Sequence, residues 1–149
     1  MATINPFDPR TVLLAKHAQH VVLIHFPIAL FITGVALDLF SRGKPGSPLA
    51  AAAYLNLSIA AATVLPTILT GLLAWQFALD GERLKGILLI HVIAACTAAS
   101  LVIASWWVHW RARKSLQTLP AYSMLVELLG VVLIGLTAHL GGFITGVNS

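Results

Sequence analysis

Four long apolar segments constrain this chain more than any other feature of its sequence. They run over residues 20–40, 49–79, 86–110 and 122–147. Each reaches the length of about 20 residues that a helix needs to cross the hydrocarbon core of a membrane. Only 9% of the residues are charged, whereas a soluble domain carries about 25%. The sequence therefore predicts an integral membrane protein seated in the lipid bilayer.

The polar breaks between these segments are short. They read SRGKPGSP, DGERLKG and RARKSLQTLP, and glycine, proline and serine of this kind favour turns. Short loops join antiparallel neighbours in a helical bundle. We therefore expect one transmembrane domain over residues 1–149, an all-α bundle of four transmembrane helices in up-down-up-down order.

The basic residues of the loops give the predicted orientation. Arg10, Lys16, Arg83 and Lys85 lie on the side of the termini, and Arg42, Lys44, Arg111, Arg113 and Lys114 lie on the other side. Loops on the cytoplasmic side carry the excess of lysine and arginine. By a margin of one charge, we expect the termini outside. The start of the chain lacks a basic stretch followed by an apolar one, so it does not read as a cleavable signal peptide.

Three histidines stand at one predicted depth. His25 is about five residues into the first span, His91 about five into the third, and His139 about seven or eight before the end of the fourth. At 1.5 Å per residue, all three lie about 8–12 Å below the membrane face on the side of the termini. His20 lies nearer the interface. Histidines inside membrane spans usually face the bundle interior or a water-filled cavity, so a shared site is predicted.

This pattern leaves several occupants open. Two imidazoles on facing helices suit the iron of b-type haem, with Lys16, Arg83 and Lys85 near its propionates. A quinone carbonyl hydrogen-bonded to a histidine is a second occupant. A metal ion bound directly by His25, His91 and His139 is a third. Without any occupant, the histidines would form hydrogen bonds between helices.

Other polar residues carry less weight in the sequence. Asp38 and Glu127 lie near the far ends of their spans, and we expect them at the interface. His109 lies at the same far side, among Trp106, Trp107 and Trp110, and is left out of the histidine group. The chain has one cysteine and no HExxH, phosphate-binding or GxSxG motif, which gives a hydrolase or a phosphoryl-transfer enzyme no support. A nucleic-acid partner is not expected either, because the positive charge lies in loops.

The run HVVLIHFPIAL, residues 20–30, resembles a family of small four-helix bacterial membrane proteins known as domain of unknown function 2231, whose pattern reads approximately HPxxVHFPIAL. The likeness continues through TGLLAWQF, with Gly71 and Trp75, through His91, and through the closing GGFITGV. It covers nearly the whole chain. Two positions depart from the family: Val21 stands in place of proline, and Ala74 in place of the aspartate that many members have.

The resemblance implies a multi-pass protein of the bacterial inner membrane. Similar domains occur fused to Rieske iron–sulfur domains, and this association implies electron transfer, with haem or quinone favoured over a structural metal. We therefore expect an electron carrier that binds haem b through His25 and one or both of His91 and His139, with His20 at the edge. Its partner would be a membrane redox complex of Rieske or cytochrome type, or a second copy of the chain.

Two other functions remain open at this point. The first is a non-catalytic membrane subunit of a larger respiratory or photosynthetic complex, because small size and four spans suit that role equally well. The second is a metal-binding or transport-related membrane protein, for which four spans are few unless the chain dimerises. A stand-alone enzyme is less expected than a carrier or a subunit.

Overall fold

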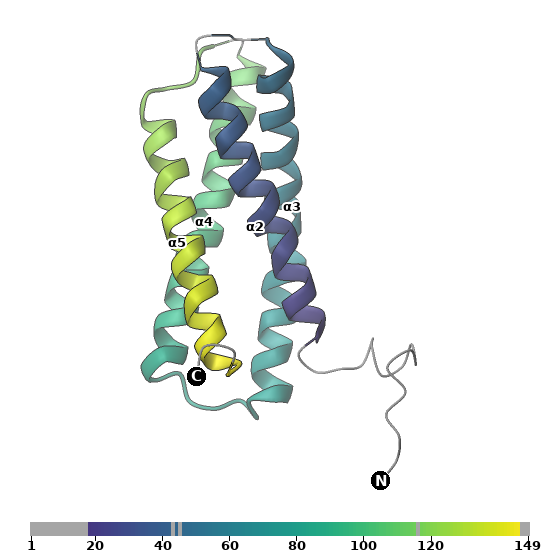
Figure 1. The fold of residues 1–149 in the computed structure, drawn as a ribbon, viewed down its shortest axis with the longest axis vertical. Helices are drawn as coiled ribbons and strands as arrows, with labels where there is room; N and C mark the ends of the chain where they lie inside the picture. The colour runs from purple at the N-terminus through teal and green to yellow at the C-terminus, as the bar shows by residue number, and fades with distance from the viewer. Residues whose placement is uncertain (1–17, 43, 45, 116, 147–149) are drawn as a thin grey trace.

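Four long helices make up the fold in a computed structural model that describes residues 18–42, 44, 46–115 and 117–146 (Figure 1). They are α2 (Ala18–Ser41), α3 (Pro48–Ala78), α4 (Gly86–Lys114) and α5 (Tyr122–Ile144). The predicted spans match these bounds closely, although α4 continues four residues beyond the predicted end at residue 110. The predicted four-helix up-down-up-down bundle is confirmed. Lys16, named in the prediction, lies outside the described residues.

Local sequence explains where α3 begins. Ser47 precedes the helix in an extended conformation, and its side chain accepts a hydrogen bond from the Ala50 amide at 3.2 Å. Pro48 follows at the first helical position, where its missing amide hydrogen costs nothing. The helix then runs for 31 residues, or about 46 Å. It is therefore long enough to cross a membrane with some tilt or protrusion.

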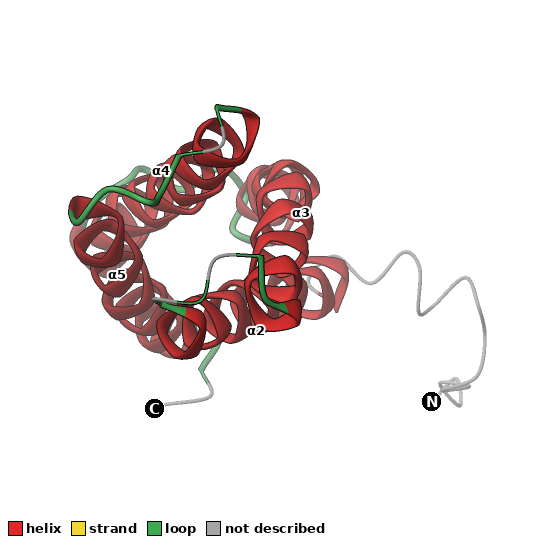
Figure 2. Cartoon of the chain, turned by 90° about the horizontal axis from the view of Figure 1, so that it is seen from above, coloured by secondary structure: helices red, strands yellow, loops and turns green. Residues whose placement is uncertain are grey.

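The helices pack as two antiparallel hairpins, α2 with α3 and α4 with α5, and contacts are denser within each hairpin than between them. Seen from above, the four helices form a ring in which α3 neighbours α4 and α2 neighbours α5 (Figure 2). The hairpins lie close together at the end that carries the α2–α3 and α4–α5 connections, which we call the closed end. They stand further apart at the opposite end, the open end (Figure 1).

The core lies between these two ends. Its buried side chains come from all four helices: Phe31, Val35, Leu57, Ala60, Val64, Ala98, Val102 and Ile134. Two glycines allow close approach of the helices. A Cβ at Gly34 would lie 3.0 Å from the Leu57 side chain, and one at Gly130 would lie 2.8 Å from the Phe31 ring. Phe31 therefore packs directly against the backbone of α5.

The outer surface of the bundle is apolar. Phe40, Leu65 and Val132 expose 72%, 68% and 66% of their surface. Such large exposed side chains suit a protein whose surroundings are lipid tails rather than water. All four helices are long and apolar enough to cross a membrane. The chain is thus a multi-pass membrane protein with four candidate spans, and the predicted contact with a lipid bilayer follows from them.

Candidate functional site

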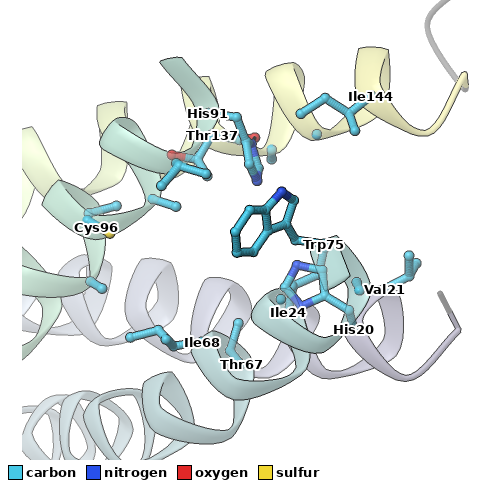
Figure 3. Close-up of a pocket in the computed structure, with 18 of the residues that line it drawn as sticks. His20, Val21, Ile24, Thr67, Ile68, Trp75, His91, Cys96, Thr137 and Ile144 are labelled. Carbon is cyan, nitrogen blue, oxygen red and sulfur yellow. Dashed lines mark hydrogen bonds between the residues drawn. The ribbon is translucent and has the colours of Figure 1, made fainter. Parts of the chain in front are cut away.

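The open end holds a pocket between the two hairpins, with a volume of about 530 Å³. Its lining is mostly aliphatic, and all four helices contribute to it. Among the few polar side chains that line it are His20, His25 and His91, and Figure 3 shows His20 and His91. Val64, Val102 and Ile134 line it too and also belong to the core, so the pocket reaches inward as far as the buried layer.

His91 enters the pocket from α4. Its Nδ1 lies 3.1 Å from the carbonyl oxygen of Thr137 on α5. A carbonyl oxygen only accepts hydrogen bonds, so Nδ1 must carry the proton and donate. In a neutral imidazole the other nitrogen, Nε2, then keeps its lone pair. The α4–α5 hairpin thereby fixes one tautomer of His91 and directs its ring into the pocket (Figure 3).

His20 lines the pocket from the opposite hairpin. Its Nδ1 lies 3.2 Å from the hydroxyl oxygen of Thr70 on α3. The Thr70 hydroxyl already donates to the carbonyls of Pro66, at 2.9 Å, and Thr67, at 3.1 Å. Its oxygen can therefore accept a hydrogen bond from His20 Nδ1, and the Thr67 backbone is a second hydrogen-bond partner of the His20 ring. A Cβ at Gly71 would lie 3.0 Å from the His20 ring, so glycine is what gives the imidazole room.

The other two predicted histidines lie differently. His25 also lines the pocket, but it is exposed, and its Nδ1 donates to the carbonyl of Val21 on its own helix at 2.6 Å. His139 is not among the described residues that line the pocket, and its ring packs edge-on against Phe143 at 5.0 Å. The structure thus brings His20, His25 and His91 to one pocket and leaves His139 outside it. Whether any of them binds a cofactor stays a prediction.

Trp75 also lines the pocket. Its indole lies between His91 and His20 as drawn in Figure 3, and its Nε1–H donates to the carbonyl of Glu82 at 2.8 Å. Small residues line the pocket near the two imidazoles, namely Gly71, Ala74, Ala138, Gly141 and Gly142. A flat ligand could therefore approach the helix backbones closely, with an aromatic ring beside it.

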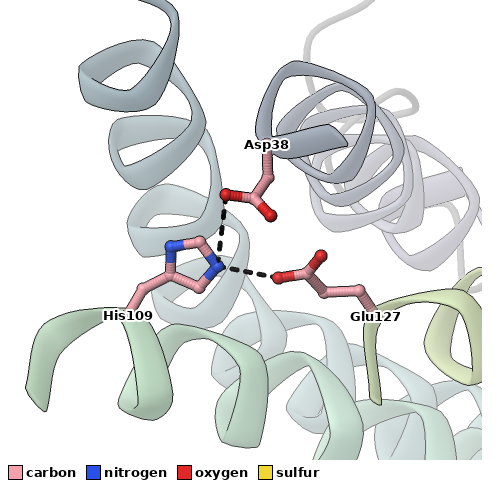
Figure 4. A group of neighbouring side chains, drawn as sticks. All are labelled: Asp38, His109 and Glu127. Carbon is pink, nitrogen blue, oxygen red and sulfur yellow. Dashed lines mark hydrogen bonds and ion pairs between the residues drawn. The ribbon is translucent and has the colours of Figure 1, made fainter. Parts of the chain in front are cut away.

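A second polar site lies at the closed end, where Asp38, His109 and Glu127 face one another (Figure 4). They come from α2, α4 and α5, and only 2%, 4% and 1% of their surfaces are exposed. His109 Nε2 lies 2.7 Å from Glu127 Oε1 and 3.9 Å from Asp38 Oδ1. Buried charged side chains require partners, and here His109 lies beside both carboxylates.

Arg42 completes this closed-end cluster, which we define as Asp38, Arg42, His109 and Glu127. One terminal nitrogen of its guanidinium lies 3.1 Å from Asp38 Oδ2 and 3.7 Å from Glu127 Oε2. The same nitrogen donates to the Ser123 hydroxyl at 3.1 Å. The Arg42 side chain is 27% exposed, so it reaches from the surface into the cluster.

The closed-end cluster differs from what the sequence predicted. Asp38 and Glu127 were expected at the interface, and His109 outside any group, whereas all three are buried inside the bundle. One reason is that α4 ends at Lys114 rather than at residue 110, which places His109 more than a turn inside its helix. The depth count that grouped the other histidines would also have placed these three residues together at the far side.

Comparison with known proteins identifies one family. A family model described as predicted membrane protein (DUF2231) matches residues 16–146. The match includes both the pocket and the closed-end cluster. Comparisons with curated proteins and with solved structures gave no significant match.

Proposed function

We propose, from the premise that this chain belongs to the DUF2231 family of predicted membrane proteins, that it is a membrane-embedded electron-transfer protein that binds b-type haem in the open-end pocket. The observation that carries the proposal is the pair of imidazoles on opposite hairpins; the Trp75 indole lies between them (Figure 3), so haem binding would require this ring to move aside. His91 donates from Nδ1 to Thr137 and so keeps a lone pair on Nε2, and His20 Nδ1 lies within hydrogen-bond distance of Thr70. A hydrogen bond from the other ring nitrogen is how proteins orient histidine ligands.

The donor set and the surroundings suit haem. Iron in b-type haem takes two imidazoles, and its macrocycle requires an apolar slot. The pocket offers a volume of about 530 Å³ with a mostly aliphatic lining. His25 lines the same pocket and is the alternative ligand on α2. Arg83 and Lys85 flank the pocket-lining Leu84 in the α3–α4 connection, where they would meet the propionates.

The protein and the haem would have different roles in electron transfer. Haem would supply one-electron chemistry. The chain would supply the two ligands, hold their tautomers through Thr70 and Thr137, and keep the macrocycle in a low-dielectric environment, which is one of the levers on its potential. Electrons would pass between the membrane and a redox partner on the open-end side.

The test is the absorption spectrum of protein purified after haem-replete expression. We expect a Soret band and about one haem per chain by the pyridine haemochrome assay. His91→Ala and His20→Ala should each abolish or strongly shift the band, and His25→Ala should leave most of it. His139→Ala should retain it, because that ring lies outside the pocket lining. Absence of haem in the wild-type protein, or loss with His139→Ala alone, would refute the proposal.

A quinol is the second candidate ligand, and the tautomer of His91 favours it in one respect. Nε2 of His91 accepts rather than donates a hydrogen bond, so it would receive the O–H of a quinol. The apolar lining and Trp75 suit the ring and tail of such a molecule. Quenching of Trp75 fluorescence by a short-chain quinol, present in the haem-free wild type and absent in His91→Ala, would support this ligand over haem.

A further inference from the structure

We propose that the closed-end cluster is a binding site for a divalent first-row transition metal ion, with Asp38, His109 and Glu127 as its ligands and Arg42 as the internal cation with which the metal competes. The proposal is independent of the haem assignment. His91 and His109 are 18 residues apart on α4, which separates the two sites by about 27 Å along the helix. The two can therefore be tested separately.

Three ligand atoms of the required kinds converge at one point. One nitrogen of His109 and one oxygen each of Asp38 and Glu127 all lie within 4.8 Å of one another. Metal–nitrogen and metal–oxygen bonds are about 2.0–2.2 Å, so tetrahedral ligand atoms stand about 3.4 Å apart. The His109–Glu127 contact of 2.7 Å would widen as a metal replaces the shared proton, and the 3.9 Å contact to Asp38 would narrow. Both movements are under 1 Å.

The two buried carboxylates of the closed-end cluster require positive charge nearby. Asp38 and Glu127 bring two carboxylates into the bundle, and their side chains are only 3% and 2% exposed. Arg42 supplies one positive charge. A divalent ion with two carboxylates and a neutral imidazole is electrically neutral without Arg42. Because the Arg42 side chain is already 27% exposed, its long stem can carry the guanidinium out to the membrane surface.

Arg42 satisfies the carboxylates only in part. A guanidinium binds carboxylates best through two parallel hydrogen bonds, but here one nitrogen serves Asp38, Glu127 and Ser123 together. Arg42 Nε is buried without a hydrogen-bond partner among the described residues, and so is Asp38 Oδ2, whose contact to Arg42 is an ion pair alone. Asp38 points into the cluster (Figure 4). Asp38 Oδ2 therefore depends on the Arg42 ion pair alone, and a metal ion that replaced Arg42 would supply the positive charge that this carboxylate needs.

One further buried polar atom lies close to His109 in the sequence. The Ser105 hydroxyl is buried and has no hydrogen-bond partner among the described residues. Ser105 precedes His109 by four residues on α4, which puts both on the same face of the helix.

The types of ligand limit which metal ions the site would bind. Imidazole with carboxylates suits Zn²⁺, Mn²⁺ and Fe²⁺, whereas Ca²⁺ and Mg²⁺ take oxygen ligands alone.

The experiment measures binding of Zn²⁺ and Mn²⁺ to the full-length protein in detergent after treatment with a chelator. We use a His20→Ala/His91→Ala parent so that pocket imidazoles do not contribute. Equilibrium dialysis should find one ion per chain. Glu127→Gln and His109→Gln should each lower the affinity by more than about tenfold, since loss of an outer-shell partner alone typically costs about 10–100-fold. Glu82→Gln, which removes an exposed carboxylate in the α3–α4 connection, is the matched control and should change nothing.

Arg42→Gln separates a metal site from an internal ion-pair network. If Arg42 competes with the metal, its removal should raise the affinity by about tenfold or more, although it destabilises the metal-free protein. Circular dichroism establishes that each variant is folded, and Asp38→Asn gives a second ligand variant. Failure of the folded His20→Ala/His91→Ala parent and of its folded Arg42→Gln variant to bind either ion would overturn the proposal. So would equal affinity in Arg42→Gln and its parent.

Discussion

At the closed end, polar contacts join the two hairpins, whereas at the open end the hydrogen bonds described for His20 and His91 each stay within one hairpin. Arg42 on the α2–α3 hairpin reaches Glu127 and Ser123 on α5. By contrast, His20 is bound by Thr70 within the first hairpin, and His91 by Thr137 within the second. This difference accompanies the close approach of the hairpins at one end and the pocket between them at the other. A hydrogen bond holds the two hairpins together only where its donor and its acceptor lie on different hairpins.

The largest effect should follow from Glu127→Ala. This change leaves His109 buried without its closest partner and removes one of the two carboxylates that Arg42 contacts, and breaking a buried ion pair costs about 3–5 kcal/mol. The free energy of unfolding in micelles, measured without metal, should fall by that amount. Glu82→Ala, at an exposed position, should change it by less than about 0.5 kcal/mol. Equal effects of the two substitutions would mean that the closed-end cluster does not hold the hairpins together.

Gly130→Ala should have the next largest effect, midway between the two ends. Its new Cβ would lie 2.8 Å from the Phe31 ring, which is fully buried and has no room to move. Overpacking of this kind costs about 1–3 kcal/mol. Gly135→Ala is the matched control, because nothing lies within 4 Å of its Cβ. Thermal unfolding of both variants measures the difference, and a destabilised Gly135→Ala would count against steric contact as the cause.

Ser123→Ala should weaken the closed end by a smaller amount. It removes the hydroxyl that accepts a hydrogen bond from Arg42 across the hairpins. One hydrogen bond contributes about 0.5–1.5 kcal/mol, and the partial exposure of Arg42 puts this one at the lower limit. The same unfolding measurement applies. In an Arg42→Gln background the substitution should have almost no effect, and a loss that persists there would point to a different role for Ser123.

Thr70→Val should have the smallest effect on stability, under about 1 kcal/mol, because the bond it removes lies within one hairpin. Its main consequence should be at the pocket, where His20 loses the acceptor that fixes its tautomer. If haem binds as proposed, the Soret band should shift or weaken while His25→Ala leaves it in place. A normal spectrum in Thr70→Val would show that His20 needs no such anchor.

The sequence predicted the fold well and the sites in part. Helix bounds followed from apolar length, and the predicted segment over residues 20–40 became α2 over residues 18–41. Depth along the membrane also followed from counting. The direction in which a side chain points around its helix did not follow from counting. Counting therefore did not separate His20 and His91, which face one pocket, from His139, which packs against Phe143. Burial of Asp38 likewise depends on helices that are remote in sequence.

The packed layer around Phe31 has a consequence for the membrane as a whole. Phe31, Leu57 and Val102 fill the bundle between a hollow at one face and ionisable groups at the other. A voltage of about 100 mV across a membrane contributes about 2.3 kcal/mol per elementary charge. A continuous file of water molecules between the two ends would conduct protons down this potential. The Phe31 ring against the bare backbone of Gly130 belongs to this packed apolar layer, which opposes a continuous file of water between the two ends.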